Sequence, residues 1–224
     1  MISYKEALAL IAYEAYFQSS RRVDRYEALG LIAAADVVAQ LDVPSFDNSA
    51  MDGFALHAIK TVDTNRQTPN RFKVSHCLAA GDVLDSADQT LAVEIMTGAK
   101  MPSGFDAVIP IEKVNTITNE NGETVEIEIN APLQIGDNVR YAGEDFKSGQ
   151  IIATKGTRLH AGHIAAMAAT GIHEVTVFNM PEIEIFTTGK EVSDAYHVPL
   201  KDGEIYNSNT PYLLCQFKAS GIPA

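Results

Sequence analysis

A polar loop between two apolar runs holds the first residues whose types and spacing could do chemistry. The stretch "VPSFDNSAMDGFAL" (residues 43–56) places four polar side chains within six positions: Asp47, Asn48, Ser49 and Asp52. Carboxylates in a polar loop can hold a hard cation such as Mg²⁺. Asp-Gly is also an ordinary turn pair, and from these residues alone the turn interpretation is favoured. The same alternatives apply to Gly143-Glu144-Asp145.

A second polar loop, "TTGKE" (residues 187–191), has some features of a phosphate-binding loop. Glu184 and Glu191 occupy the positions that a P-loop needs for Gly and for Ser or Thr, so we reject that motif. Thr188, Gly189 and Glu191 would still follow the carboxyl end of a strand, where open α/β sheets bind ligands. A ligand role and an ordinary turn remain equally open for this loop.

Histidine and cysteine do not form a metal-ligand pattern. His160 and His163 lie three positions apart at a helix start, and without a third ligand we favour helix capping or solvent exposure over metal binding. Cys77 and Cys215 form no C-x-x-C pair. Two cysteines without this spacing indicate neither a disulfide framework nor a structural zinc site, and they favour a reducing cytoplasm.

Composition describes a soluble, acidic, globular protein. The 224 residues, 46% hydrophobic and 21% charged, suffice for one large domain or two ordinary ones. With 17 Lys and Arg against 29 Asp and Glu, the net charge of −12 disfavours nucleic acids and anionic membranes as partners. The opening "MISYKEALALIAYEAYF" is interrupted by Lys5, Glu6 and Glu14, so we expect a soluble helix rather than a signal or membrane-spanning segment.

The elements that position these loops begin with that helix. Ser3 and Glu6 form a capping box, and apolar residues follow at helical spacing: Leu8, Ile11, Ala12, Ala15 and Tyr16. A second short helix is predicted from Tyr26 to Ala34. Pro44 then restricts Val43 and ends regular structure.

The middle of the chain, to about residue 146, is rich in short β-strands. Four runs separated by Gly, Asp and Pro predict strands: "RFKVSHCLA", "TLAVEIMTG", "DAVIPIEKV" and "TVEIEI". The stretch "NTITNENGETVEIEI" predicts a hairpin that turns at Asn121-Gly122. Val125, Ile127 and Ile129 alternate with Glu126, Glu128 and Asn130, so the glutamates would face water.

The last part of the chain predicts a helix and then the beginning of an α/β unit. "HAGHIAAMAATG" predicts a helix that Gly171 ends. After Met180-Pro181, "EIEIFTTG" is interpreted as a buried strand, and Thr210-Pro211 as the N-cap and first position of a helix. A strand and one helix cannot cover a parallel sheet, so we expect an incomplete domain here.

Five motifs occur in this sequence in the same order as in a known protein family. "LDVPSFDNSAMDGFAL", "VEIMTGAKMPSGFDAVIPIE", "NVRYAGEDFKSGQIIATKGTRL", "EIEIFTTGKEV" and "GEIYNSN" together resemble the MoeA/gephyrin family, the molybdopterin molybdenumtransferases, over about residues 25–215. The resemblance implies a cytoplasmic enzyme that inserts molybdate into adenylylated molybdopterin and releases AMP with Mg²⁺. It also implies a homodimer, and a molybdopterin adenylyltransferase as upstream partner.

The resemblance further implies a multidomain fold of α+β and α/β type. Residues 1–42 plus 147–178 would form a helical dimerisation domain, and residues 43–146 an inserted β-domain. Residues 179–224 would begin an incomplete α/β molybdopterin-binding domain.

Residue roles carry over from the family by motif. The resemblance implies catalytic roles for Asp52, Thr97 and Asp145, substrate binding by Ser49, Arg140, Thr188, Gly189 and Glu191, and metal binding by Asp52, Asp145 and Glu191. Thr97 would donate a hydrogen bond to an oxoanion and Arg140 would clamp one. In the implied dimer, Glu191 of the partner subunit would complete the site. Asn48 and Ser49 are expected to shape the loop through side-chain to backbone bonds.

Two alternatives from other classes stay open. One is that this length is a catalytically silent fragment of the enzyme, or else a gephyrin-like interaction or scaffold module. An exposed apolar patch over residues 205–224 would favour the fragment, and a polar, capped end would favour the module. The other is a binding domain for another nucleotide-linked cofactor, which rests on fold analogy alone. Lys190 departs from the family pattern, because many relatives have Asp or Asn before the glutamate.

Overall fold

The computed structural model describes residues 2–14, 19–181 and 183–222. It divides into two compact units, which are described separately. Unit 1 comprises residues 1–37, 151–168 and 172–224, and unit 2 comprises residues 38–150 and 169–171. The chain leaves unit 1 at β2 (Val37–Val38) and returns to it at β11 (Ile151–Ala153). None of the described helices is both long enough and apolar enough to cross a bilayer.

Unit 1 begins with the predicted N-terminal helix, α1 (Tyr4–Glu14). The backbone N–H of Ser3 donates to Glu6 Oε2 at 2.7 Å, and the N–H of Glu6 donates to Ser3 Oγ at 3.2 Å. These reciprocal bonds satisfy two amides that the first turn leaves free, and they confirm the capping box. The predicted helical positions Ala15 and Tyr16 lie outside the described residues.

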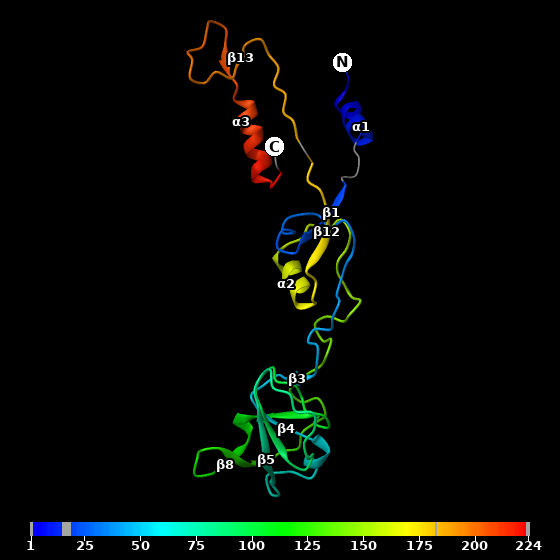
Figure 1. The fold of residues 1–224 in the computed structure, drawn as a ribbon, viewed down its shortest axis with the longest axis vertical. Helices are drawn as coiled ribbons and strands as arrows, with labels where there is room; N and C mark the ends of the chain where they lie inside the picture. Colours follow the sequence, from blue (N-terminus) through cyan, green and yellow to red (C-terminus); the bar gives the residue numbers. More distant parts are fainter. Residues whose placement is uncertain (1, 15–18, 182, 223–224) are drawn as a thin grey trace. The chain divides into compact units, whose positions relative to one another are not determined.

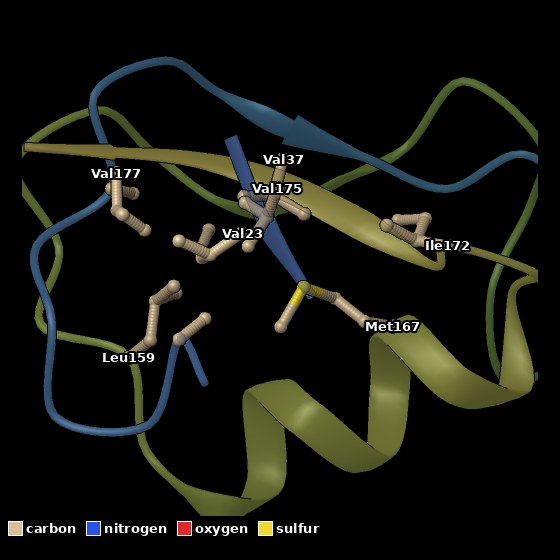
Figure 2. Close-up of a cluster of buried hydrophobic side chains, with 10 residues drawn as sticks. Val23, Val37, Leu159, Met167, Ile172, Val175 and Val177 are labelled. Carbon is tan, nitrogen blue, oxygen red and sulfur yellow. The ribbon is translucent and has the colours of Figure 1, made fainter. Parts of the chain in front are cut away.

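The core of unit 1 joins two segments that are far apart in the sequence. Strand β1 (Ser20–Asp24) pairs antiparallel with β12 (Glu174–Phe178), and α2 (Ala161–Ala169) contributes the buried Met167. Figure 2 shows these side chains gathered between α2 and the strands: Val23, Val37, Leu159, Met167, Ile172, Val175 and Val177. Burial of a large aliphatic side chain contributes roughly 1.5–3 kcal/mol. As predicted, α2 ends just before Gly171, whose φ is +83°.

The second predicted helix, Tyr26–Ala34, is wrong. Residues 25–30 form turns closed by local bonds such as Ala28 N–H to Asp24 O, and three later amides donate to distant carbonyls instead of continuing a helix. Gly30 N–H donates to Leu159 O at 2.8 Å, Ala33 N–H to Thr157 O at 2.9 Å and Ala34 N–H to Thr176 O at 2.9 Å. Tertiary pairing therefore overrides the local helical propensity of this segment.

The C-terminal part of unit 1 differs from the prediction in its first strand. Residues 183–189 form no strand, and Phe186 is 82% exposed, so the interpretation of "EIEIFTTG" as a buried strand is wrong. Two short strands, β13 (Val192–Ser193) and β14 (Ile205–Tyr206), pair in parallel and precede α3 (Asn209–Ala219). The helix is confirmed, but its N-cap is Ser208 and not the predicted Thr210.

Unit 2 contains a mixed six-stranded sheet in the order β7-β4-β6-β5-β9-β8. Figure 1 labels three strands of this sheet, β4, β5 and β8. Its strands are β4 (Gly53–Leu56), β5 (Asn70–Leu78), β6 (Ala92–Ile95), β7 (Ala107–Pro110), β8 (Asn115–Thr118) and β9 (Thr124–Ile129). Only β5 and β6 are parallel within this described sheet. The sheet confirms the four predicted β-runs. Two 3₁₀ turns, η1 (Ala58–Thr61) and η2 (Ile111–Lys113), follow β4 and β7.

The predicted hairpin is confirmed as β8 and β9, with Gly122 at φ +83° in the turn. On the face that alternation assigns to the apolar residues, Ile127 and Ile129 are fully buried, whereas Val125 near the turn is 41% exposed. The glutamates on the opposite face are not simply solvated, because Arg71 Nε lies 2.8 Å from Glu128 Oε2 and 3.8 Å from Glu126 Oε1.

Both faces of this sheet are covered. Phe54 and Leu56 of β4 point into one apolar cluster with Phe72, Ile109, Ile127 and Ile129. The intervening Ala55 belongs to a second cluster with Val93, Ile95, Val108 and the loop residues Ala99, Met101 and Phe105. Continuous burial along β4 therefore fixes the loop that enters it at Gly53. Strand β3 (Asn48–Ser49) of that loop pairs antiparallel with β10 (Val139–Arg140).

Candidate functional site

Three loops of unit 2 are joined by backbone hydrogen bonds and bring the predicted residues of that unit together. Ser49 N–H donates to Ala99 O at 3.0 Å, and Gly98 N–H donates to Ser49 O at 2.8 Å. Ala50 N–H donates to Asn138 O at 2.9 Å. In the β3–β10 pair, Asn48 lies opposite Arg140. Residues 47–52, 97–101 and 138–145 therefore form one connected surface.

The centre of this surface is a contact between Asp52 and Thr97, which we call the Asp52–Thr97 clasp. Asp52 Oδ1 accepts hydrogen bonds from the backbone N–H of Thr97 at 2.7 Å and from its hydroxyl at 2.8 Å. These two donors lower the pKa of Asp52 below its ordinary value of 3.8, the backbone donor contributing more. Asp52 Oδ2 accepts no hydrogen bond from a described residue, and the side chain is exposed. The clasp thus presents one ionised, open oxygen to solvent.

The position of Asp52 is fixed by the strand that follows it. A Cβ added to Gly53 would overlap the carbonyl oxygen of Ile109, because β4 is sandwiched there between β6 and β7. The carbonyl of Asp52 accepts from Ile111 N–H at 3.0 Å. Gly53 therefore serves close strand packing rather than the turn that its sequence suggests.

Arg140 and Asp145 form an ion pair beside the same loops. Arg140 Nη2 donates to Asp145 Oδ1 at 2.9 Å and to Oδ2 at 2.8 Å, while Arg140 Nε lies 3.9 Å from Glu144 Oε1. The hydrogen bond and the charge of Asp145 raise the pKa of Arg140. The side chains are 41% and 48% exposed, so solvent screens the pair and it can open at low cost.

Asn48 and Ser49 shape the loop, as predicted. Asn48 Nδ2 donates to Phe46 O at 3.2 Å, and the Ser49 hydroxyl donates to Met51 O at 2.6 Å. Ser49 is fully buried, which places its hydroxyl out of reach of a substrate in this conformation. Substrate binding by Ser49 stays a prediction. Asp47, to which no role was assigned, holds the third loop by accepting from Ala142 N–H at 2.8 Å.

The remaining predicted residues, Thr188, Gly189 and Glu191, lie in unit 1. Thr188 lines a pocket of about 520 Å³ with residues of β13, β14 and the start of α3: Val192, Ile205, Tyr206, Asn207, Ser208, Asn209, Tyr212 and Leu213. A Cβ at Gly189 would lie 2.6 Å from Glu191 Oε1, so that carboxylate packs over the glycine. Ile205 N–H donates to Glu191 O at 2.7 Å. Completion of the unit 2 surface by a partner's Glu191 stays a prediction.

Asn207 is the residue of this loop that sequence reasoning missed. It is 3% exposed, its Nδ2 lies 2.9 Å from Thr187 Oγ1 and 2.8 Å from Asp194 Oδ1, and its Oδ1 accepts from Thr210 N–H at 3.1 Å. It therefore ties the 187–194 loop to the first turn of α3. The signal was an asparagine just before a helix start, the usual position of a capping side chain.

Histidine takes the structural role that the sequence favoured. His160 Nδ1 lies 3.1 Å from Gly162 N, and His163 Nδ1 lies 3.2 Å from His160 N, at the start of α2. Burial, and then the charge of His160, lower the pKa of His163. Across residues 2–14, 19–181 and 183–222, no group of three or more His, Cys, Asp or Glu side chains could hold a metal. A metal held by one or two carboxylates stays a prediction.

Comparisons with known proteins agree on one family. The model of the MoeA N-terminal region (domain I and II) matches residues 2–171. The molybdopterin molybdenumtransferase of Staphylococcus aureus strain Mu50 is 35% identical over 226 residues, covering 99% of this chain and 51% of that protein. The enzyme of the same name from Bacillus subtilis strain 168 is 37% identical over 196 residues, covering 87% of this chain and 45% of that protein.

Two crystal structures of the molybdopterin biosynthesis MoeA protein from Pyrococcus horikoshii match over 100% of this chain, each with a TM-score of 0.84. They are 31% and 29% identical to it, and the matches cover 55% and 58% of those chains. The chain thus spans about half the length of the curated relatives it matches.

Proposed function

The chain belongs to the MoeA family, to whose N-terminal region it corresponds, and from this premise we propose that it is part of a molybdopterin molybdenumtransferase. The proposed reaction inserts molybdate into adenylylated molybdopterin and releases AMP. Support comes from the names of the relatives and from the two solved structures, together with the loops of unit 2.

The observation that carries the proposal is the Asp52–Thr97 clasp. Two donors hold Asp52 Oδ1, so the carboxylate stays ionised and its orientation is fixed. Oδ2 remains open toward solvent, where it can meet a cation or a proton of the substrate. A carboxylate that is oriented before the substrate arrives loses little conformational freedom on binding.

The donor set fits Mg²⁺. This ion is usually held by one or two carboxylates and keeps several waters for exchange with phosphate oxygens. Asp52 Oδ2 offers one such oxygen, and Asp145 offers a second carboxylate that Arg140 already orients. When bound, Mg²⁺ would neutralise the charge of a pyrophosphate in a protein whose own net charge is −12.

The other residues act on the oxoanions. The Arg140 guanidinium can exchange its exposed pair with Asp145 for a phosphate or molybdate oxygen, since planar N–H groups match oxoanions well. Thr97 positions Asp52, so its proposed role in oxoanion binding is indirect: its hydroxyl is used within the clasp.

We also propose the assembly that the family implies, a cytoplasmic homodimer supplied by a molybdopterin adenylyltransferase. Apolar side chains on α1 are exposed and would suit burial against a second copy: Tyr4, Leu8, Leu10, Ile11 and Tyr13. The substrate is an adenylylated pterin, so an adenylyl-transferring enzyme must act before this one.

The scaffold alternative receives no support from the surface near α3. Ile205 is 55% exposed and Tyr212 is 63% exposed, with Leu213 and Leu214 beside them. These side chains form an exposed apolar patch. The scaffold alternative would instead favour a polar, capped surface over residues 205–224.

The experiment mixes the 224-residue chain with adenylylated molybdopterin, Mg²⁺ and molybdate and follows AMP release. We expect molybdate-dependent release that falls on the order of a hundredfold in Asp52→Asn, because a neutral amide removes the charge that the site requires. The matched control is Asp88→Asn, since Asp88 Oδ1 accepts the same two kinds of hydrogen bond from Thr90. Equal activity in Asp52→Asn and wild type would contradict the proposed role of Asp52.

The wild-type result is decisive by itself as well. If the 224-residue chain releases no AMP while the full Bacillus subtilis relative does, the activity needs parts of the relative that this chain does not match. The two substitutions, transferred to that relative, would then decide the role of the aspartate.

A further inference from the structure

A polar pocket of about 490 Å³ lies in unit 2 and does not include the Asp52–Thr97 clasp. It is formed by the loop after η1, by the end of β7 with η2, and by the segments that follow β9 and precede β10. Its lining residues are Arg66, Ile109, Pro110, Lys113, Asn130, Ala131, Pro132, Leu133, Asp137 and Asn138. A volume of this size suits a small organic ligand.

The charge of this pocket is opposite to that of the protein. Arg66 and Lys113 both line it, and neither forms a salt bridge with a described carboxylate, although acidic residues outnumber basic ones by 29 to 17. The lining contains one carboxylate, Asp137, whose Oδ2 accepts from Gln134 N–H at 2.8 Å. Two unpaired cations in an acidic protein create a local site for an anion.

Hydrogen bonds fix two walls of the pocket. The buried Thr61 accepts from Leu133 N–H at 2.8 Å and donates its hydroxyl to Ala58 O at 2.7 Å, which holds the wall after β9. Asn138 Nδ2 donates to Val108 O at 2.8 Å, which holds the wall before β10 against β7. Walls that are formed before a ligand arrives reduce the ordering cost of binding.

The turn that carries Arg66 is also ordered. Asn65 Oδ1 accepts from Gln67 N–H at 2.9 Å and from Thr68 N–H at 3.0 Å, and Asn65 N–H donates to Thr68 O at 3.2 Å. Arg66, which lines the pocket, is therefore carried by a closed turn. Lys113 stands at the end of η2.

We propose that this pocket binds a small organic phosphate monoester. Arg66 and Lys113 would receive the phosphate, because a monoester carries about two negative charges at neutral pH and these cations supply two positive ones. The organic part would lie against the apolar lining, to which Ile109, Pro110 and Leu133 contribute. This site is separate from the proposed site of molybdate insertion, since Asp52, Thr97 and Arg140 do not line it, although Asn138 of the 138–145 loop borders both.

The test titrates phenyl phosphate into the ¹⁵N-labelled 224-residue chain and follows amide shifts by NMR, with phenol as the uncharged probe. We expect shifts at Lys113, Asn130 and Ala131, none from phenol, and binding about tenfold weaker in Arg66→Gln/Lys113→Gln. The matched control is Lys60→Gln/Lys73→Gln, which removes two exposed cations of unit 2 from outside the pocket lining and should bind like wild type.

Further arms of the same titration separate the parts of the proposal. Asp137→Asn should bind phenyl phosphate at least as tightly as wild type, because it removes the one negative charge from the lining. Inorganic phosphate should bind more weakly than phenyl phosphate. Equal affinity of the two would contradict the proposal that the apolar lining binds the organic group of the ligand.

Four results would overturn the site itself. They are no shift with phenyl phosphate at millimolar concentration, equal binding of phenol, equal loss in the control double variant, and shifts centred on Asp52 and Thr97. The first three results would leave AMP release by the chain unchanged, and the fourth would place phenyl phosphate at the clasp, where it should inhibit AMP release. Failure of this site and failure of the proposed reaction are therefore distinguishable.

Discussion

Two aspartate–threonine contacts in unit 2 have the same chemistry and different placement. Asp52 Oδ1 accepts from Thr97 N–H and hydroxyl at 2.7 and 2.8 Å, and Asp88 Oδ1 accepts from Thr90 N–H and hydroxyl at 2.9 and 2.8 Å. In both cases the two donors lower the pKa of an exposed carboxyl, the backbone donor most. The hydrogen bonds alone therefore do not distinguish a site from a turn.

The difference lies in what each contact joins. Thr90 is two residues from Asp88, so that contact closes its own turn. Thr97 is 45 residues from Asp52, so the clasp joins two loops, and the backbone bond from Ala50 to Asn138 adds a third. Placement between loops, with Arg140 and Asp145 beside it, makes Asp52 the candidate and leaves Asp88 a control.

The largest effect is expected from the strand that places Asp52. Gly53→Ala should lower the free energy of unfolding by about 3 kcal/mol, because its Cβ overlaps a backbone carbonyl that a packed sheet cannot move. Gly81→Ala is the control: Gly81 has φ +100° and open space around it, so only the left-handed backbone opposes the change, at about 1 kcal/mol.

Urea unfolding of both glycine variants measures this difference. Equal losses of stability at Gly53 and Gly81 would show that β4 does not hold the Asp52 loop as tightly as the contacts suggest.

A smaller effect is expected from the hydroxyl donors. Thr97→Val should raise the pKa of Asp52 but leave it below its ordinary value, because the backbone donor remains. Thr90→Val should do the same to Asp88. Only Thr97→Val should also reduce AMP release, by about tenfold, since a charge-assisted hydrogen bond that orients the carboxylate is lost.

Carboxyl ¹³C titrations of the two valine variants, combined with the AMP assay, test this prediction. Thr97→Ser serves as a rescue control, because it keeps the hydroxyl. Loss of activity in Thr90→Val as well would remove the distinction between the two contacts.

The smallest effect is expected from acid. A carboxyl whose folded pKa lies below its unfolded value stabilises the fold above the unfolded pKa and loses that contribution as pH falls through the folded pKa. For Asp52 and Asp88 this window lies below their common ordinary value of 3.8. Protonation of Asp52 should release the 97–99 loop, whereas protonation of Asp88 should disturb only residues near Thr90.

Amide shifts recorded across that window check the difference. Changes at Thr97 should extend to Gly98 and Ser49, which share backbone bonds, and changes at Thr90 should stay local. Equally wide changes around both threonines would contradict the account.

Sequence predicted best what depends on neighbours in the chain. The Ser3–Glu6 capping box, the hairpin turn at Gly122 and the end of α2 before Gly171 are all set by residues a few positions apart. The helix predicted at Tyr26–Ala34 failed because its amides bond to residues 157–176. The strand predicted over residues 182–189 failed for the related reason that a strand requires a partner, and residues 183–189 have none in the described chain.

The candidate site divides in the same way. The residue types of the loops are visible in the sequence, and the motif resemblance identified Asp52, Thr97, Arg140 and Asp145. Neither their pairing nor the burial of Ser49 could be predicted, because a contact over 45 positions depends on how β4 and β6 align in the sheet. The central position of Asn207 was missed because its partners come from three separate segments.

The most direct test of the central claim compares the two threonine amides in one sample. Mn²⁺, a paramagnetic ion that shares the preference of Mg²⁺ for oxygen ligands, is added to the ¹⁵N-labelled chain, and line broadening is measured at Thr97 and Thr90. We expect the Thr97 amide to broaden at low Mn²⁺, the Thr90 amide to stay sharp, and Asp52→Asn to abolish the broadening at Thr97. Equal broadening at both threonines, or broadening at Thr97 that survives Asp52→Asn, would contradict the assignment of Asp52 as the cation-binding carboxylate.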